Sequence, residues 1–318
     1  MSQQCYQRDI YGETLVRLGK EDKNIVVLDA DLSGSTKTCL FAKEFPERFF
    51  NFGVAEQNMM ATAAGLASCG KTVFVSTFAI FASGRAWDQV RNSISYNNFN
   101  VKIVATHAGL TVGPDGASHQ ALEDIALMRA LPRMNIIVPC DGPQTADAIT
   151  AAAVGSGPFY VRLGRSRVPT IEGKGEFTFG KAQVLTEGND VTLITCGVLV
   201  NEAITAIKNL SAKGISVRLV NMHTIRPLDA ETILKAAKET KFFVVCEEHS
   251  VVGGLASAID EVVSQNTPVK VLRLGIRSRF GQSGEPAELL KEYNLTSSVK
   301  KSPGFCNSLK KDWPAGWT

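Results

Sequence analysis

The sequence predicts an α/β protein of two doubly wound domains with mostly parallel sheets. Short apolar runs such as Ile25-Val26-Val27-Leu28 are hydrophobic at successive positions, which is typical of strands covered on both faces. These runs alternate with helical stretches, as in an open sheet with helices on both sides. The rhythm is broken once, by the glycine-rich and charged stretch Pro169–Gly188, and then restarts.

The first domain is expected to span residues 1–170. Its strands are expected at Asn24–Asp31, Lys71–Phe78, Val101–Gly109, Asn135–Asp141 and Pro158–Arg165. Its helices are expected at Tyr11–Lys20, Glu56–Cys69, Ser83–Asn97, Gln120–Leu131 and Gln144–Gly155. A linker is expected over residues 171–188, because glycine and proline interrupt regular elements.

The second domain, smaller and also α/β, is expected over residues 189–302. Its strands are expected at Val191–Gly197, Ile215–His223, Lys241–Glu247 and Val269–Gly275. Its helices are expected at Val200–Lys213, Ala230–Thr240, Gly254–Ser264 and Pro286–Tyr293. Residues 303–318 show no clear periodicity and are expected to form a tail outside the fold.

Bulk composition excludes several classes of function. Hydrophobic residues make up 44% of the 318 residues, enough for substantial cores in roughly two domains. The net charge is only +3, so a nucleic-acid partner is not expected. The chain has neither a secretory signal pattern nor an apolar run near the ~20 residues that cross a bilayer. Seven scattered cysteines without a Cys-x-x-Cys pair indicate reduced thiols in a cytoplasmic protein and disfavour structural zinc.

An acidic residue, Glu56, opens an alanine-rich predicted helix within Gly53-Val54-Ala55-Glu56-Gln57. An acid in the first turn is stabilised by the positive end of the helix, by about 0.3–1 kcal/mol. Gly53 can serve as the cap. Composition alone therefore favours a structural role for Glu56.

Two phenylalanines, Phe78 and Phe81, follow the end of a predicted strand. In a doubly wound sheet, ligands bind in the crevice beyond the carboxyl ends of the strands. Aromatic rings there can sandwich a flat heterocycle. Phenylalanine is usually a core residue, so this pair alone is a weak signal.

A loop suited to ligand contact runs from Thr106 to Gln120, directly after a predicted strand. It carries His107, Asp115 and His119, and thus two of the four histidines, with three glycines and a proline. Such a loop is poor core material and suits binding. His119 precedes a predicted helix, whose amino end disfavours an imidazolium, so a neutral hydrogen-bonding ring is expected there. The loop lacks the clustered carboxylates or cysteines of a metal site.

Three arginines lie close together in Arg162-Leu163-Gly164-Arg165-Ser166-Arg167, at the end of the last predicted strand of the first domain. They form either a solvated face or a phosphate site. The second interpretation rests on the guanidinium fork, which matches the geometry of phosphate oxygens.

Taken in order, these segments resemble the transketolase family. The stretch Gly53–Gln57 resembles the family motif around the glutamate that activates the cofactor. Thr77-Phe78 with Phe81 resembles its aromatic pocket for an aminopyrimidine ring. The spacing of His107, Asp115 and His119 matches its substrate-binding loop.

Three further stretches extend this resemblance over nearly everything from Arg8 to about Lys300. Asp31-Leu32-Ser33-Gly34-Ser35 resembles the family segment near the donor sugar. His223–Asp229 and Gly253-Gly254-Leu255 resemble its C-terminal domain. Each motif is weak alone, and their shared order makes the signal strong.

The resemblance implies a thiamine-diphosphate enzyme. Glu56 would hydrogen-bond N1′ of the aminopyrimidine and so promote loss of the thiazolium C2 proton. Val54 would be the apolar wedge that keeps the cofactor bent, while Phe78 and Phe81 would line the pyrimidine pocket. The reaction implied is reversible transfer of a two-carbon glycolaldehyde unit from a ketose phosphate to an aldose phosphate, as in the pentose phosphate pathway.

The resemblance also implies contacts to the sugar phosphate. His107 and His119 would hydrogen-bond substrate oxygens and act in catalysis, and Asp115 would contact a sugar hydroxyl. The remaining substrate contacts would come from Asp31, near the donor sugar, and from Arg165, Arg8 and Ser35, at the phosphate.

One family feature is missing from the chain. The family holds the diphosphate and its metal through a Gly-Asp-Gly segment and a later asparagine, and no Gly-Asp-Gly occurs here. A diphosphate needs a dication with oxygen ligands. We therefore expect a separate N-terminal transketolase subunit to hold the diphosphate and Mg²⁺ or Ca²⁺, and this chain to supply no metal ligand. The family further implies a dimer of this subunit within a heterotetramer.

Other interpretations remain open from the sequence. Ala55-Glu56-Gln57 also resembles deoxyxylulose-phosphate synthase, although His107 matches transketolase where the synthase differs. The beta subunit of a 2-oxo-acid dehydrogenase has the same layout, and Thr224-Ile225-Arg226-Pro227 fits it. The segments Asp115–Gln120 and Asp31–Ser35 fit transketolase better. A non-catalytic subunit that kept the fold is a third alternative.

Overall fold

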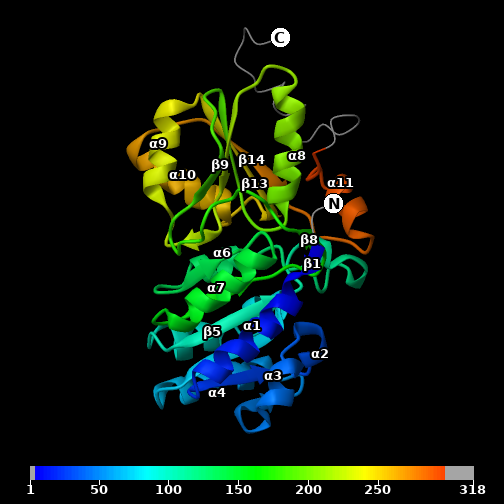
Figure 1. Ribbon diagram of the computed structural model, residues 1–318, viewed down its shortest axis with the longest axis vertical. Coiled ribbons are helices and arrows are strands. Elements are labelled where there is room, and N and C mark those ends of the chain that lie inside the picture. The colour runs from blue at the N-terminus through cyan, green and yellow to red at the C-terminus, as the bar shows by residue number, and fades with distance from the viewer. Residues whose placement is uncertain (1–3, 298–318) are drawn as a thin grey trace.

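The structure is a computed structural model that describes residues 4–297. The tail expected at residues 303–318 lies outside the described residues. Figure 1 shows two α/β domains, one above the other along the long axis of the molecule. The predicted fold class is confirmed, since each domain is built on an open and mostly parallel sheet with helices on both faces.

The first sheet has seven strands in the order β12-β6-β7-β5-β4-β2-β3, all parallel except β12. Their bounds are β2 Ile25–Asp29, β3 Phe49–Asn51, β4 Thr72–Phe78, β5 Val101–Thr106, β6 Asn135–Ile137, β7 Phe159–Arg162 and β12 Thr224–Arg226. The five strands expected from the sequence are all present. The sequence analysis missed β3 and β12, which form the two edges.

Helices cover both faces of this sheet, and residue alternation in the strands divides the core. Ile25 and Val27 of β2 pack with the face covered by α1 (Gln7–Glu21), α3 (Cys39–Glu44) and α7 (Gly142–Val154). Val26 and Leu28 pack with the opposite face. The elements on that face are α4 (Glu56–Ser68), η2 (Phe81–Arg85), α5 (Trp87–Gln89), η3 (Val90–Ser95) and α6 (Asp124–Arg129).

One expected helix, at residues 83–97, is not continuous. The structure has two π-helical stretches, η2 and η3, with the short α5 between them. π-Helical turns are rare and are found mostly at functional sites. The Ser-Gly pair at positions 83 and 84 gives a physical reason for the break, because both residues are weak helix formers.

The second sheet has the order β14-β13-β10-β11-β9, parallel except for β9. Its strands are β9 Gln183–Thr186, β10 Val191–Thr195, β11 Val217–Asn221, β13 Phe242–Ser250 and β14 Val271–Ile276. Its helices are α8 Leu199–Ser211, α9 Ala230–Glu239, α10 Leu255–Asn266 and α11 Pro286–Glu292.

Two strands differ from the domain division expected from the sequence. The stretch expected as a linker, residues 171–188, contains β9, which pairs antiparallel with β11. The strand β12, from the second half of the chain, completes the first sheet by pairing with β6. A two-stranded sheet, β1 (Gln4–Tyr6) with β8 (Arg167–Pro169), closes the start of the chain onto the end of the first domain. The chain is therefore interlocked at the boundary.

The two domains share their hydrophobic core. The cluster on the α4 and α6 face of the first sheet continues into side chains from β10, β11, α9 and α10 of the second domain. A second cluster, centred on α8 and α11, includes Leu110 and Leu122 from the first domain. Burial of apolar surface on this scale, at about 25 cal/mol per Å², makes independent motion of the domains costly.

A buried ion pair lies at the same boundary. Arg162 Nε donates to Asp124 Oδ2 at 2.7 Å, and both side chains are almost fully buried. The Tyr160 hydroxyl donates to the same carboxylate oxygen at 2.7 Å. Burial opposes ionisation of Asp124, but the adjacent Arg162 outweighs it and holds the pKa of Asp124 below its ordinary value.

We expect Asp124→Asn to lower the free energy of unfolding by about 3–5 kcal/mol, because it leaves the Arg162 charge buried without its counter-ion. Urea denaturation followed by circular dichroism measures this. Glu21→Gln is the control, since it removes the surface ion pair to Arg17, whose side chain is 49% exposed, and costs within about 1 kcal/mol. Equal losses in the two variants would contradict the prediction.

Candidate active site

The candidate residues of the first domain gather at one edge of its sheet. The strands β7, β5, β4 and β2 are consecutive in the sheet, and one of the predicted segments begins at or directly after the end of each. Because all four strands are parallel, their carboxyl ends lie at the same edge, where open α/β sheets bind ligands. The site is therefore assembled from loops that are far apart in the sequence.

Glu56 is the first residue of α4 and is buried, with 1% of its surface exposed. Its two carboxylate oxygens both accept from Arg85 Nη1, at 2.9 and 3.0 Å. A buried carboxylate must be paired. The Arg85 side chain is 48% exposed, so this partner lies at the surface end of the pair.

Arg85 was not among the residues singled out in the sequence. It closes the π-helical stretch η2, and its guanidinium lies over the Phe81 ring at 4.7 Å from the centroid. The sequence feature that could have indicated Arg85 is its position four residues after Phe81, in a stretch whose Ser-Gly pair breaks the helix. Its pairing with Glu56, 29 positions away, depends on the fold.

The predicted aromatic and histidine residues form one cluster. The Phe78 ring stacks on the His107 ring with centroids 3.9 Å apart, and Phe81 lies nearly parallel to Phe78 at 6.1 Å. His119 presents its ring edge-on to Phe81 at 5.4 Å. The cluster therefore joins β4, η2 and the loop after β5 into a single apolar and polarisable wall.

His107 is buried in this cluster in a defined neutral state. Its Nδ1 lies 2.9 Å from the Thr106 hydroxyl, and its Nε2 lies 3.5 Å from Arg8 Nη1. Because arginine only donates, Nε2 is the acceptor and the proton is on Nδ1. Burial, together with the positive charges of Arg8 and Arg165, lowers the pKa of His107 to about 3.

Two arginines converge beside His107. Arg165 Nη1 donates to the Val112 carbonyl and lies 3.9 Å from Asp115 Oδ1. Arg8 belongs to α1, more than 150 positions earlier in the chain. Together they make the rim of the site cationic around the loop that carries Asp115 and His119.

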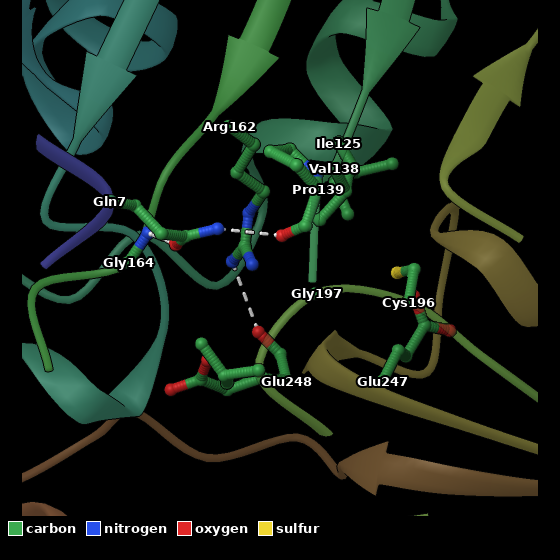
Figure 2. Close-up of a pocket in the computed structure, with 11 residues that line it drawn as sticks. Gln7, Ile125, Val138, Pro139, Arg162, Gly164, Cys196, Gly197, Glu247 and Glu248 are labelled. Atoms are coloured by element: carbon green, nitrogen blue, oxygen red, sulfur yellow. Dashed lines mark hydrogen bonds between the residues drawn. The ribbon is translucent and has the colours of Figure 1, made fainter. Parts of the chain in front are cut away.

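The buried amide of Gln7 positions the backbone next to these two arginines. Figure 2 shows this amide between Pro139 and Gly164. Its Nε2 donates to the Pro139 carbonyl at 2.8 Å, and its Oε1 accepts from the Gly164 N–H at 2.9 Å. Gln7 precedes Arg8 and Gly164 precedes Arg165. The amide therefore fixes the backbone on which each arginine is mounted.

The segment of Asp31 and Ser35 is held by a buried carboxylate. Asp29 Oδ2 accepts from the hydroxyls of Thr36 and Thr38, each at 2.8 Å. Ser35 lies in the short helix α2 (Ser33–Thr36). Asp31 has a positive φ of 64°, which is uncommon for a residue other than glycine.

Asp31 is connected to the segment of Glu56 through Asn51. The Asn51 side-chain oxygen accepts from the N–H groups of Asp31 and Gly53, at 3.1 and 3.0 Å. Val54 follows, and it is 73% exposed. Single exposed apolar residues are common on protein surfaces, so the exposure of Val54 marks no site by itself.

Two further findings concern the whole described chain. Within residues 4–297, no group of three or more His, Cys, Asp or Glu side chains is arranged to hold a metal ion. In the same residues, every helix is too short or too polar to span a bilayer.

Comparison with known families identifies the architecture. The model of the transketolase pyrimidine-binding domain matches residues 4–170, and that of the transketolase C-terminal domain matches residues 180–299. The first match alone covers more than half of the chain. The chain belongs to the transketolase family, as its motifs predicted.

Individual relatives agree with this assignment. A putative transketolase C-terminal section from Methanocaldococcus jannaschii is 54% identical over 289 residues, covering 90% of each chain. A 6-deoxy-6-sulfo-D-fructose transketolase subunit from a Clostridium species is 40% identical, covering 91% of this chain and 90% of the relative. The structure of a split-gene transketolase, described as an inactive beta4 tetramer, superimposes with a TM-score of 0.85 at 51% identity, covering 92% and 94% of the two chains.

We expect His107 to remain neutral from pH 8 to pH 5, because its pKa of about 3 lies below that range. An exposed histidine is half-protonated near pH 6.5. Nuclear magnetic resonance of protein labelled with ¹³C-histidine, with the His107 signal assigned by its loss in His107→Asn, measures this. A titration midpoint between pH 6 and 7 for that signal would show that the ring is not desolvated as described.

Proposed function

We propose that the chain is the C-terminal subunit of a split transketolase, which moves a two-carbon glycolaldehyde unit reversibly between sugar phosphates. The observation that carries the proposal is the placement of buried Glu56 at the sheet edge, beside a wall of Phe78, Phe81, His107 and His119. A carboxylate, aromatic rings and imidazoles are groups that can bind a heterocyclic cofactor and a polyhydroxylated substrate.

The residues present fit the pyrimidine end of thiamine diphosphate. Bound there, the cofactor supplies a thiazolium ring that stabilises negative charge on a substrate carbon. Glu56 would hydrogen-bond the ring nitrogen N1′, and Phe78 and Phe81 would contact the ring. Arg85, which now holds both oxygens of Glu56, would have to share or release the carboxylate.

The other end of the site would take an anionic sugar. Arg8 and Arg165 would bind the phosphate, with Ser35 contributing from α2. Asp115 would accept from a sugar hydroxyl, and Asp31 would lie near the donor. His107 and His119 would hydrogen-bond substrate oxygens and hold or move a proton at those atoms.

In this proposal, a second polypeptide completes the site. The sequence has no Gly-Asp-Gly, the segment with which the family holds the diphosphate and its metal, so an N-terminal subunit would hold the diphosphate and its Mg²⁺ or Ca²⁺. Val54, at 73% exposure, would then be covered by the cofactor and that subunit. The split-gene relative supports this arrangement, and a dimer of this chain within a heterotetramer is part of the proposal.

The identity of the sugar pair is a separate question. One relative is a subunit for 6-deoxy-6-sulfo-D-fructose, whose anionic end is a sulfonate. The arginine pair at this site suits either anion, because both present oxygens to a guanidinium fork. We propose ketose and aldose phosphates, and xylulose 5-phosphate with ribose 5-phosphate is the first pair to test.

We expect Glu56→Gln to reduce turnover of the complex reconstituted with its N-terminal subunit, thiamine diphosphate and Mg²⁺ by at least about 100-fold. The carboxylate supplies proton chemistry that an amide cannot, and general acid–base groups contribute about 10²–10⁴-fold. The assay is product formation from xylulose 5-phosphate and ribose 5-phosphate, with pyruvate as the alternative donor.

Glu47→Gln is the matched control, because Glu47 is 68% exposed and contacts only its neighbour Arg48; it should leave turnover unchanged. Full activity of Glu56→Gln would indicate a structural subunit. Turnover of pyruvate but not of the sugar pair would indicate 2-oxo-acid chemistry. Thiamine-diphosphate-dependent activity of this chain alone would overturn the two-subunit proposal.

We expect Arg165→Leu to raise KM for xylulose 5-phosphate by about 10–100-fold, since a hydrogen bond to a charged group contributes about 1.5–3 kcal/mol. KM for unphosphorylated xylulose should change little. Arg91→Leu is the matched control, because Arg91 is an exposed residue of η3 that donates to the side chain of its neighbour Asn92 and was not predicted to contact the phosphate. Equal losses with both sugars would remove Arg165 from the phosphate site.

A further inference from the structure

The loop that carries Asp115 and His119 has an irregular backbone. Between residues 107 and 116, four residues adopt positive φ: His107 at 57°, Gly109 at 80°, Gly113 at 82° and Gly116 at 77°. The loop contains a short 3₁₀ segment, η4 (Leu110–Asp115), which is kinked at Gly113. Hydrogen bonds within the loop, such as those from the Gly116 N–H to the Gly113 carbonyl and from the His119 N–H to the Gly116 carbonyl, stabilise part of this shape, and contacts from the second domain add to them.

The second domain supplies one support, Glu248. This residue lies near the end of β13, is 4% exposed, and accepts the Thr111 backbone N–H on Oε1 at 2.5 Å. The carboxylate also lies directly under Gly109. A Cβ at that position would meet Glu248 Oε2 at 2.5 Å and Oε1 at 2.6 Å, so the loop approaches this carboxylate as closely as glycine permits.

The second domain contacts the far end of the loop as well. Gln120 Nε2 donates to the Gln282 carbonyl at 2.9 Å and to the Leu110 carbonyl at 3.2 Å. Gly116 lies so close to Ser283 that a Cβ there would meet its hydroxyl at 2.6 Å. The loop is thus held at Thr111, Gly116 and Gln120 by residues of the other domain.

Burial of apolar side chains also holds both ends of the loop against the second domain. Leu110 and Leu122, which flank the segment of Asp115 and His119, are buried in the core formed by α8 and α11 of the second domain. Arg162 adds a third connection, because its Nη2 donates to the carbonyls of Ala121 at 3.2 Å and Glu248 at 3.0 Å. Figure 2 shows this guanidinium reaching toward the Glu248 carbonyl.

We propose that the second domain is a working part of the substrate site, with Glu248 as the positioning residue that fixes the loop of residues 107–120 for binding the sugar phosphate. The inference rests on the proposed function for its substrate class. Glu248 touches no substrate. It acts through the Thr111 N–H and the close approach at Gly109, and so sets where Asp115 and His119 stand.

The test uses Glu248→Ala, Glu248→Gln and a matched control, Glu261→Gln. Glu261 also bridges the two domains, by accepting from Arg129 Nη2 at 2.8 Å, but it contacts α6 and not the loop. Glu248→Gln keeps an oxygen that can accept the Thr111 N–H. The complete chain serves for amide hydrogen exchange, and the complex reconstituted with the N-terminal subunit serves for kinetics.

We expect Glu248→Ala to increase hydrogen exchange at residues 109–120 by at least about tenfold while exchange in α1 and α4 stays unchanged. KM for xylulose 5-phosphate should rise about 10–100-fold, with a smaller effect on kcat, because misplacement of a binding group by about 1 Å can cost 10²-fold. Glu248→Gln should recover most of both losses. Glu261→Gln should show neither.

The proposal is overturned if Glu248→Ala exchanges as the wild type does at residues 109–120, or if Glu261→Gln raises KM equally. If Glu248→Ala does not fold, Glu248→Gln and Thr111→Pro are compared instead. Glu248→Gln should leave KM and exchange unchanged, because its amide oxygen still accepts the Thr111 N–H. Thr111→Pro removes that N–H and should raise KM. Wild-type KM in Thr111→Pro overturns the proposal. Failure of the proposed function is distinguishable, because the exchange experiment does not depend on activity.

Discussion

The buried pair of Asp124 and Arg162 is the interaction on which the remaining structure depends. Arg162 ends β7 and Asp124 begins α6, so the pair joins the two segments that leave the sheet on either side of the site. The same guanidinium donates to a carbonyl of the second domain. Because neither charge can be left alone in the interior, the position of each element constrains the other.

The candidate site has its charged groups at two separate ends. Two arginines stand near His107 and, with burial, keep its ring neutral, whereas Glu56 is neutralised by Arg85 on the other side of the aromatic wall. Under the proposed function, an anionic sugar would be attracted to one end, and a ring able to hydrogen-bond a carboxylate would be accommodated at the other. The Glu56 pair also means that binding at the second end must compete with an existing ionic contact.

Much of the candidate site followed from the sequence because the family motifs lie where strands end. Phe78 ends a predicted strand of the first sheet, and His107 and Arg165 follow two others. Parallel strands bring such positions to one edge without further information. Glu56 follows β3, a strand that the sequence analysis missed, so its place at this edge came from the structure. The roles of Arg85 and Glu248 could not be predicted from the sequence. Their partners are 29 and 137 positions away. An arginine after a Ser-Gly pair, or two acidic residues near the end of an apolar strand, does not indicate which distant residue it will contact.

The boundary between the domains shows the same limit. Periodicity located the strands and helices well, yet the stretch expected as a linker contains β9, and β12 joins the sheet of the other domain. Both are short edge strands, of four and three residues. A strand of that length carries too few side chains to display an alternating pattern, so its pairing is decided by the sheet edge that is available to it.

By itself the sequence determined the α/β class, the buried parallel strands, and the loops that carry the carboxylate, the aromatic rings and the histidines. These are local properties, encoded in hydrophobic runs and in short motifs. Only the tertiary structure decided the neutral state of His107, the capture of Glu56 by Arg85 and the support of the loop by Glu248. Each of these depends on charges and hydrogen-bond partners brought together from distant parts of the chain, where removal from water makes their arrangement matter.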